Sequence, residues 1–193
     1  EASALEPDEQ RAAIDAVIRA CGDAGTRVIV GTGSYNTRAT IRATEALADT
    51  PSVVAALVVV PYYVRPSVEG IVAHYKAVAA VSPVPVIAYN IPTRTGRDLG
   101  AAGLLELASV PNIAGVKQAV ATLDADTLEV LANAPDGFSV LGGEDTLLFP
   151  LMLMAVNSNG LRAATHLPGF PTRSFLAFFI PFSFIQGALF ASG

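Results

Sequence analysis

A lysine at the end of an apolar run is the strongest candidate for chemistry in this sequence. Lys117 follows the apolar stretch 113–116, whereas the other lysine, Lys76, lies on an expected helix and is interpreted as solvated. Burial disfavours the charged form of an amine, so it would lower the pKa of Lys117 and free the amine as a nucleophile, as in Schiff-base lysines. The alternative is a lysine whose amine reaches solvent past the end of a strand.

Tyrosine and arginine residues follow two other apolar runs. Tyr89 is near the end of the run 84–90, where its hydroxyl would reach the mouth of a site, and Arg94 follows in a loop stiffened by proline. A guanidinium there could bind a carboxylate through two parallel hydrogen bonds, with an ordinary surface arginine as the alternative. Tyr62 and Tyr63 stand between two prolines after another run. For them the alternative is a packed rim with a satisfied hydroxyl.

Glycines follow the remaining runs. The Gly-Thr-Gly motif at 31–33 does not match a G-x-G-x-x-G phosphate loop, because position 36 is asparagine. It is interpreted as a tight turn or as the close approach of a ligand. The glycines at 142–143 would leave backbone N–H groups bare at the mouth of the site. Asp145 is interpreted as the N-cap of the next helix.

Short β-branched runs alternate along the chain with Ala/Leu-rich segments of helical period. The expected strands are 27–31, 54–60, 84–90, 112–117 and 138–141. The expected helices are 8–21, 37–48, 67–80, 100–109, 124–133 and 145–155. Strands separated by helices indicate a parallel sheet with right-handed crossovers, whose chemistry lies at the carboxyl ends of the strands.

Two α/β architectures fit this pattern. One is an open doubly wound sheet and the other is a (β/α)8 barrel, which needs eight strands and about 250 residues. The sequence offers five strands and a possible sixth at 160–165, which Arg162 in its middle weakens.

The composition limits the classes of protein. A net charge of −5, from 12 basic and 17 acidic residues, argues against nucleic acid as a partner. The single cysteine, Cys21, excludes an intrachain disulfide framework and fits a reducing compartment, so we expect a cytoplasmic protein. The region after Asp145 is nearly free of charge and rich in phenylalanine near its end. We therefore divide the chain into residues 1–165 and an aberrant apolar tail, 166–193.

Five motifs together resemble the dihydrodipicolinate synthase / N-acetylneuraminate lyase family of class I aldolases. In the order and spacing of that family they are GTG (31–33), PYYVRPS (61–67), YNIPTRTG (89–96), GVKQA (115–119) and GGED (142–145). The resemblance covers roughly residues 1–161 and implies a (β/α)8 TIM barrel. The first three residues resemble those that follow the family's Thr-Thr-Gly turn on its second strand. The expected fold is therefore an incomplete barrel with parallel strands 3 to 7 and a possible strand 8.

The resemblance also implies roles for single residues. Pyruvate would form a Schiff base on Lys117, with no other cofactor and no metal, and Tyr89 would shuttle protons beside that amine. Tyr63 would act as a relay in the neighbouring subunit's site, and Arg94 would bind the carboxylate of an aldehyde substrate. The other implied substrate-binding residues are Thr32, Gly33 and Gly143. Expected partners are a 2-keto acid, an aldehyde and further copies of the chain, since such enzymes are typically homotetramers built from tight dimers.

Arg94 favours the synthase-type members of the family, because sialic-acid lyases lack an arginine at this position. The implied reaction is the condensation of pyruvate with aspartate semialdehyde in lysine and diaminopimelate synthesis. A related aldolase or dehydratase of another 2-keto acid is one alternative, and an inactive remnant or a keto-acid-binding partner of a complete homologue is another. A third is a membrane-tethered protein spanning at 174–192, which Pro181 and Gln186 weaken.

Two further residues depart from the family pattern. Gln118 stands where the family usually has Asp or Glu, which would remove a charge beside the Lys117 amine. Arg162 would place a guanidinium on the eighth strand, where an unpaired charge is costly.

Lysine-inhibited relatives bind lysine at the interface of the dimer. The positions that correspond to their lysine-binding residues are Pro7, Gln10, Tyr35, Ala39 and Tyr62. Tyr62, the first tyrosine of the PYY motif, is the one that matches, so it is expected at the interface and no lysine binding is expected.

Overall fold

A five-stranded parallel sheet forms the centre of the described structure. The computed structural model describes residues 4–22, 26–50, 52–147, 149–151 and 153. In chain order the strands are β1 (Val28–Gly31), β2 (Val53–Val59), β3 (Val86–Asn90), β4 (Ile113–Gln118) and β5 (Ser139–Gly142). Each of the five expected strands is confirmed. The possible strand at 160–165 and the tail at 166–193 lie outside the described residues.

The helices between the strands also follow the expected pattern. They are α1 (Pro7–Gly22), α2 (Thr37–Glu45), α3 (Val68–Ala79), α5 (Gly100–Ala108) and α6 (Ala125–Asn133). Polar residues before three of them cap the first turn, because the side chains of Asn36, Ser67 and Asp124 accept hydrogen bonds from backbone N–H groups there. These caps satisfy backbone N–H groups that would otherwise be unpaired at the first turn, and so define where the helices begin.

Two elements differ from the expectation. The short helix α4 (Pro92–Thr95) lies where the sequence indicated a loop. Pro92 begins it and Gly96 ends it after one turn, at a φ of 69° that suits glycine. Asp145 is the first residue of the 3-10 helix η2 (Asp145–Leu147), so its interpretation as an N-cap was wrong. The expected helix at 145–155 extends into residues that the structure does not describe.

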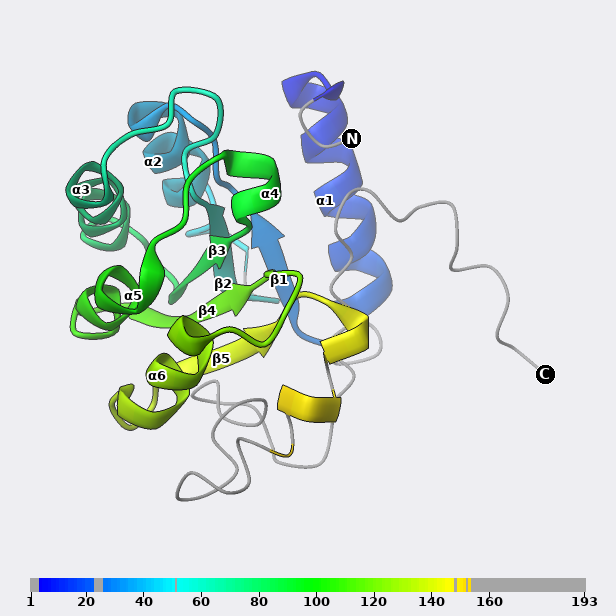
Figure 1. Ribbon diagram of the computed structural model, residues 1–193. Helices are drawn as coiled ribbons and strands as arrows, with labels where there is room; N and C mark the ends of the chain where they lie inside the picture. Colours follow the sequence, from blue (N-terminus) through cyan, green and yellow to red (C-terminus); the bar gives the residue numbers. More distant parts are fainter. Residues whose placement is uncertain (1–3, 23–25, 51, 148, 152, 154–193) are drawn as a thin grey trace.

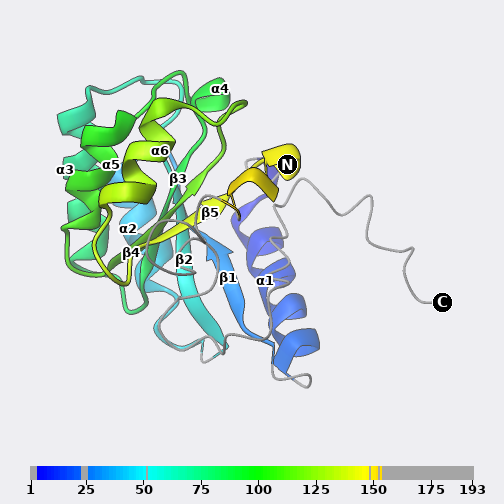
Figure 2. The ribbon, with the colours of Figure 1, turned by 60° about the horizontal axis from the view of Figure 1, so that its bottom comes forward.

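The order of the strands distinguishes a barrel segment from an open doubly wound sheet. The order is β1-β2-β3-β4-β5 and every neighbouring pair is parallel. A doubly wound sheet reverses its strand order and carries helices on both faces. Here α2, α3, α5 and α6 form one layer along the same face of the sheet, while α1 lies beside β1 (Figures 1 and 2). The described chain is therefore part of a (β/α)8 barrel, as expected.

The two faces of the sheet bury different sets of residues. The larger apolar cluster joins the sheet to the helices and includes Val58, Val116 and Tyr75. A smaller cluster lies on the other face, around Ala55, Ile87 and Leu141. In the described residues no helix is both long enough and apolar enough to cross a membrane.

Candidate active site

Lys117 and Tyr89 lie side by side at the carboxyl ends of neighbouring strands. They occupy paired positions in the register between β3 and β4. The Lys117 Nζ lies 4.4 Å from the centroid of the Tyr89 ring. Successive residues of a strand point to opposite faces, so Tyr89 shares the face of Ile87, away from the helix layer. The predicted nucleophile and the predicted proton shuttle are thus brought together.

Burial lowers the pKa of the Lys117 amine. The residue is 6% exposed, so desolvation lowers the pKa of its amine below the ordinary value. The carboxylate of Asp145 acts in the opposite direction and raises this pKa. Because burial is the larger cause, the neutral, nucleophilic form of the amine is more populated than in a surface lysine.

Charged groups from α4 and from the loop after β5 act on the Tyr89 hydroxyl. Burial raises the pKa of Tyr89, and the Glu144 carboxylate raises it further, while the Arg94 guanidinium lowers it. Arg94 lies in α4, and its residue is exposed. The phenol is therefore kept protonated, which is the form that can donate a proton. The electrostatic roles of Glu144 and Asp145 were missed from the sequence, which gives no distance from this segment to β3 or β4.

The glycines near the strand ends serve the packing of the strands. A Cβ on Gly33 would lie 2.3 Å from the Val59 backbone nitrogen, so glycine lets the backbone after β1 approach β2. The Gly143 N–H donates to the Gln118 carbonyl oxygen at 2.9 Å. The expectation that this N–H is bare was therefore wrong, because it is used between β4 and the loop after β5.

The Thr32 side chain is used inside the fold. Its Oγ1 lies 2.8 Å from the Thr44 Oγ1 in α2, and its backbone N–H donates to the Leu57 carbonyl oxygen. The hydroxyl thus contacts the helix layer. Substrate binding by Thr32, Gly33 and Gly143 stays a prediction.

The two tyrosines of the PYY motif lie in different environments. The Tyr62 ring packs edge-on against Tyr35, with 5.6 Å between ring centroids. Tyr63 is 90% exposed and has a φ of 67°. A positive φ is uncommon outside glycine, so the loop holds Tyr63 outward at a conformational cost. The structure does not bring Tyr63 to Lys117 in the same chain, and its relay role stays a prediction about a neighbouring subunit.

Gln118 does not lie beside the Lys117 amine. Its buried side chain accepts a hydrogen bond from Asn90 Nδ2 and donates one to Thr127 Oγ1 in α6. It therefore points toward the helices, on the opposite face from Lys117. From the sequence we expected that glutamine at position 118 removes a charge beside the Lys117 amine. That expectation was wrong, because side chains alternate along β4 and position 118 faces the helices.

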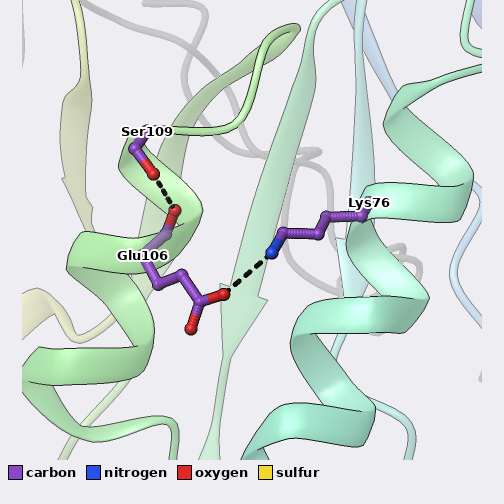
Figure 3. A network of polar contacts seen from close by, with 3 residues as sticks. All are labelled: Lys76, Glu106 and Ser109. Atoms are coloured by element: carbon purple, nitrogen blue, oxygen red, sulfur yellow. Dashed lines mark hydrogen bonds and ion pairs between the residues drawn. The ribbon is translucent and has the colours of Figure 1, made fainter.

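Lys76 provides an internal comparison for Lys117. Its Nζ pairs with a carboxylate oxygen of Glu106 at 2.8 Å, between α3 and α5, and both side chains are half-exposed (Figure 3). The interpretation of Lys76 as a solvated lysine is confirmed, while its partner was not foreseen. Such a surface ion pair is worth about 0–1 kcal/mol.

Among the residues that the structure describes, no group of three or more histidine, cysteine or carboxylate side chains is placed to hold a metal ion.

Comparisons with known proteins identify the family of the chain. The sequence profile of the Dihydrodipicolinate synthetase family matches residues 1–176. The chain is 44% identical over 164 residues to a 4-hydroxy-tetrahydrodipicolinate synthase of Moorella thermoacetica, covering 83% of the chain and 53% of the relative. It is 38% identical to the same enzyme of Listeria monocytogenes, covering 88% of the chain and 57% of the relative.

Solved structures of dihydrodipicolinate synthases also resemble this chain. A dihydrodipicolinate synthase from Acinetobacter baumannii, complexed with pyruvate, superimposes with a TM-score of 0.75 at 37% identity, over 80% of this chain and 52% of that one. One from Cyanidioschyzon merolae, with lysine bound, gives a TM-score of 0.75 at 34% identity, over 82% and 53%. The chain thus spans about half the length of the relatives it matches. Because the family profile, the related sequences and the solved structures all agree, the chain belongs to the dihydrodipicolinate synthetase family.

Proposed function

We propose that this chain carries the Schiff-base site of a pyruvate-dependent lyase of the 4-hydroxy-tetrahydrodipicolinate synthase type. The observation that carries the proposal is the Lys117 amine, which is buried, lowered in pKa and placed against the Tyr89 ring. The similarity to synthases, one of them complexed with pyruvate, supports the same substrate.

The chemistry begins at the Lys117 Nζ. The neutral amine attacks the C2 keto carbon of pyruvate, and loss of one water leaves an imine between Nζ and C2. Removal of a C3 proton converts this imine into an enamine, whose C3 attacks the aldehyde carbon of aspartate semialdehyde. The Tyr89 hydroxyl is the group placed to move protons beside the imine, and Arg94 is the group for the carboxylate of the aldehyde substrate.

The assembly and the tail are further parts of this proposal. The outward position of Tyr63 supports a homo-oligomer, a dimer of dimers, in which this hydroxyl serves a neighbouring subunit. The proposed substrates are a 2-keto acid and an aldehyde, in the cytoplasm, with no metal and no cofactor beyond the covalent imine. Residues 1–165 are proposed as a partial (β/α)8 barrel and residues 166–193 as an aberrant apolar tail rich in phenylalanine.

Reductive trapping tests the proposal. The protein is incubated with pyruvate, reduced with borohydride and digested, and the peptides are weighed. We expect one reduced pyruvate adduct on the Lys117 peptide, and we expect Lys117→Ala to abolish it. Lys76→Ala is the matched control and should keep it, because Lys76 lies on the outer helix layer, half-exposed and paired with Glu106. Absence of the adduct in the parent protein, or equal trapping by both variants, refutes the proposal.

A keto-acid-binding protein without turnover is the second candidate. The observation that favours it is the buried Lys117 amine, which is sufficient by itself to hold a keto acid as an imine. This candidate predicts a pyruvate adduct on Lys117 but no consumption of aspartate semialdehyde. A coupled assay of the condensation measures that consumption.

A further inference from the structure

A buried polar bridge lies directly behind the Lys117–Tyr89 pair, on the helix-covered face of the sheet. Asn90 and Gln118 are the next paired residues of β3 and β4. The Asn90 Nδ2 donates to the Gln118 Oε1 at 2.9 Å, and the Gln118 Nε2 donates to the Thr127 Oγ1 at 3.1 Å. The three residues are 0%, 4% and 1% exposed, in that order. A continuous series of side-chain hydrogen bonds thus joins β3, β4 and α6.

The same bridge reaches the segment that carries Arg94. The Asn90 Nδ2 also donates to the Asp98 Oδ1 at 2.9 Å, and this oxygen accepts the N–H of Gly100 at the start of α5. Both hydrogens of the Asn90 amide are therefore used. The bond from Asn90 to Asp98 closes the segment 91–97, so it holds the base of the turn from which Arg94 projects.

We propose that Asn90 and Gln118 are positioning residues that hold Lys117 and Tyr89 opposite each other and fix the base of the Arg94 turn. This inference rests on the proposed function. A shift of β4 along β3 would break the bond between the two amides and leave buried polar atoms without partners, which carries a large penalty. The backbone adds to this constraint, since the Ala119 N–H donates to the Asn90 carbonyl oxygen at 2.9 Å.

Glutamine suits position 118 because its amide accepts and donates at the same time. Its Oε1 meets an N–H donor of Asn90, and its Nε2 meets a hydroxyl oxygen of Thr127. A glutamate has the same length and can accept from Asn90 and from the Thr127 hydroxyl, which rotates to donate. A methionine has similar length and makes neither hydrogen bond. These two substitutions therefore separate the hydrogen bonds from the packing.

The test measures the rate of borohydride trapping at saturating pyruvate in the full-length protein. We expect Gln118→Met to lower this rate about tenfold, because small displacements of reacting groups cost this much or more, and Gln118→Glu to retain it within about threefold. Thr127→Val removes only the acceptor of the Gln118 Nε2 and should give a smaller loss; it also serves if the methionine variant does not fold. Asn112→Gly is the matched control, because it loses the hydrogen bonds to the carbonyl oxygens of Ala79, Ser82 and Val84 before the start of β4, at the opposite end of the sheet, and should trap at the parent rate.

The possible results are distinguishable. Trapping at the parent rate by both Gln118→Met and Thr127→Val overturns this inference and leaves the proposed function intact. An equal loss in Asn112→Gly also overturns it, because the loss would then follow general destabilisation. A parent protein that forms no adduct overturns the proposed function and this inference together.

Discussion

Tyr89 and Lys117 face each other across β3 and β4, with the Lys117 amine 4.4 Å from the centroid of the tyrosine ring. Two opposing influences meet at this amine. The face of an aromatic ring attracts a cation, while burial disfavours the charged form. Burial is the larger influence on the pKa, so the pair combines a reactive amine with an adjacent phenol.

The Tyr89 hydroxyl can be tested without disturbing the ring. Tyr89→Phe keeps the contact between the ring and the amine and removes only the proton donor. We expect turnover to fall about 100-fold, the usual contribution of a positioned acid or base, with an unchanged melting temperature. Tyr35→Phe, which removes an exposed hydroxyl, should keep full turnover in the same assay. An unaffected Tyr89→Phe enzyme would exclude Tyr89 as the proton shuttle.

Two glycines after the Val28–Val30 stretch should respond differently to an added methyl group. A Cβ on Gly33 would lie 2.3 Å from the Val59 nitrogen, whereas a Cβ on Gly31 would meet nothing within 4 Å. We expect Gly33→Ala to lower the free energy of unfolding by about 3 kcal/mol or more and Gly31→Ala to change it by less than about 0.5 kcal/mol. Denaturant melts of the two variants measure this. Equal midpoints would show that β1 and β2 do not approach as described.

His74 makes the stability depend on pH. Its Nδ1 pairs with the Thr37 hydroxyl, its Nε2 is buried without a hydrogen-bond partner, and burial lowers its pKa from 6.5 to about 4. Between these values the unfolded chain binds a proton that the folded chain does not, so the stability present above pH 6.5 is lost as the pH falls toward 4.

The expected loss from about pH 7 to about pH 5 is about 2 kcal/mol from this residue. Urea melts at both pH values measure it. His74→Gln should flatten this part of the profile, because glutamine does not titrate. A parent protein that is equally stable at both pH values would contradict the burial of a neutral imidazole.

Asn112 closes the end of the sheet opposite the site. It has a φ of 66°, and its Nδ2 donates to the carbonyl oxygens of Ala79, Ser82 and Val84. Asn112→Gly keeps this backbone conformation but loses the donors, and we expect a cost of about 2 kcal/mol. Asn112→Asp should cost more near neutral pH, because its carboxylate would face three carbonyl oxygens. A glycine variant as stable as the parent in thermal melts would contradict this role.

Lysine should not regulate this protein. The Tyr62 ring packs against Tyr35, and the other positions that correspond to the lysine-binding residues of inhibited relatives are Pro7, Gln10 and Ala39. A lysine ligand would therefore meet no carboxylate or imidazole there. We expect calorimetry with millimolar lysine to give no saturable heat. Saturable binding would show that other residues form such a site.

Local sequence signals were sufficient for the five strands and for proposing Lys117 as the candidate nucleophile. The β-branched runs predicted β1 to β5, because strands buried on both faces need continuous apolar residues. The helices that follow the caps Asn36, Ser67 and Asp124 begin within one residue of the expected starts at 37, 67 and 124. Lys117 was singled out because it closes an apolar run and a lysine is rarely fully buried without a partner.

The tertiary structure decided which side chains meet. The register of β3 against β4 sets Tyr89 beside Lys117, and the period of two along each strand sends Asn90 and Gln118 to the helices. The sequence could not give this register, since residues 89 and 117 are joined by a crossover whose geometry comes from packing. The Gly143 N–H was expected to be bare, but it donates to the Gln118 carbonyl oxygen. Backbone groups near a strand end find partners on the neighbouring strand, and only the folded chain brings that strand close.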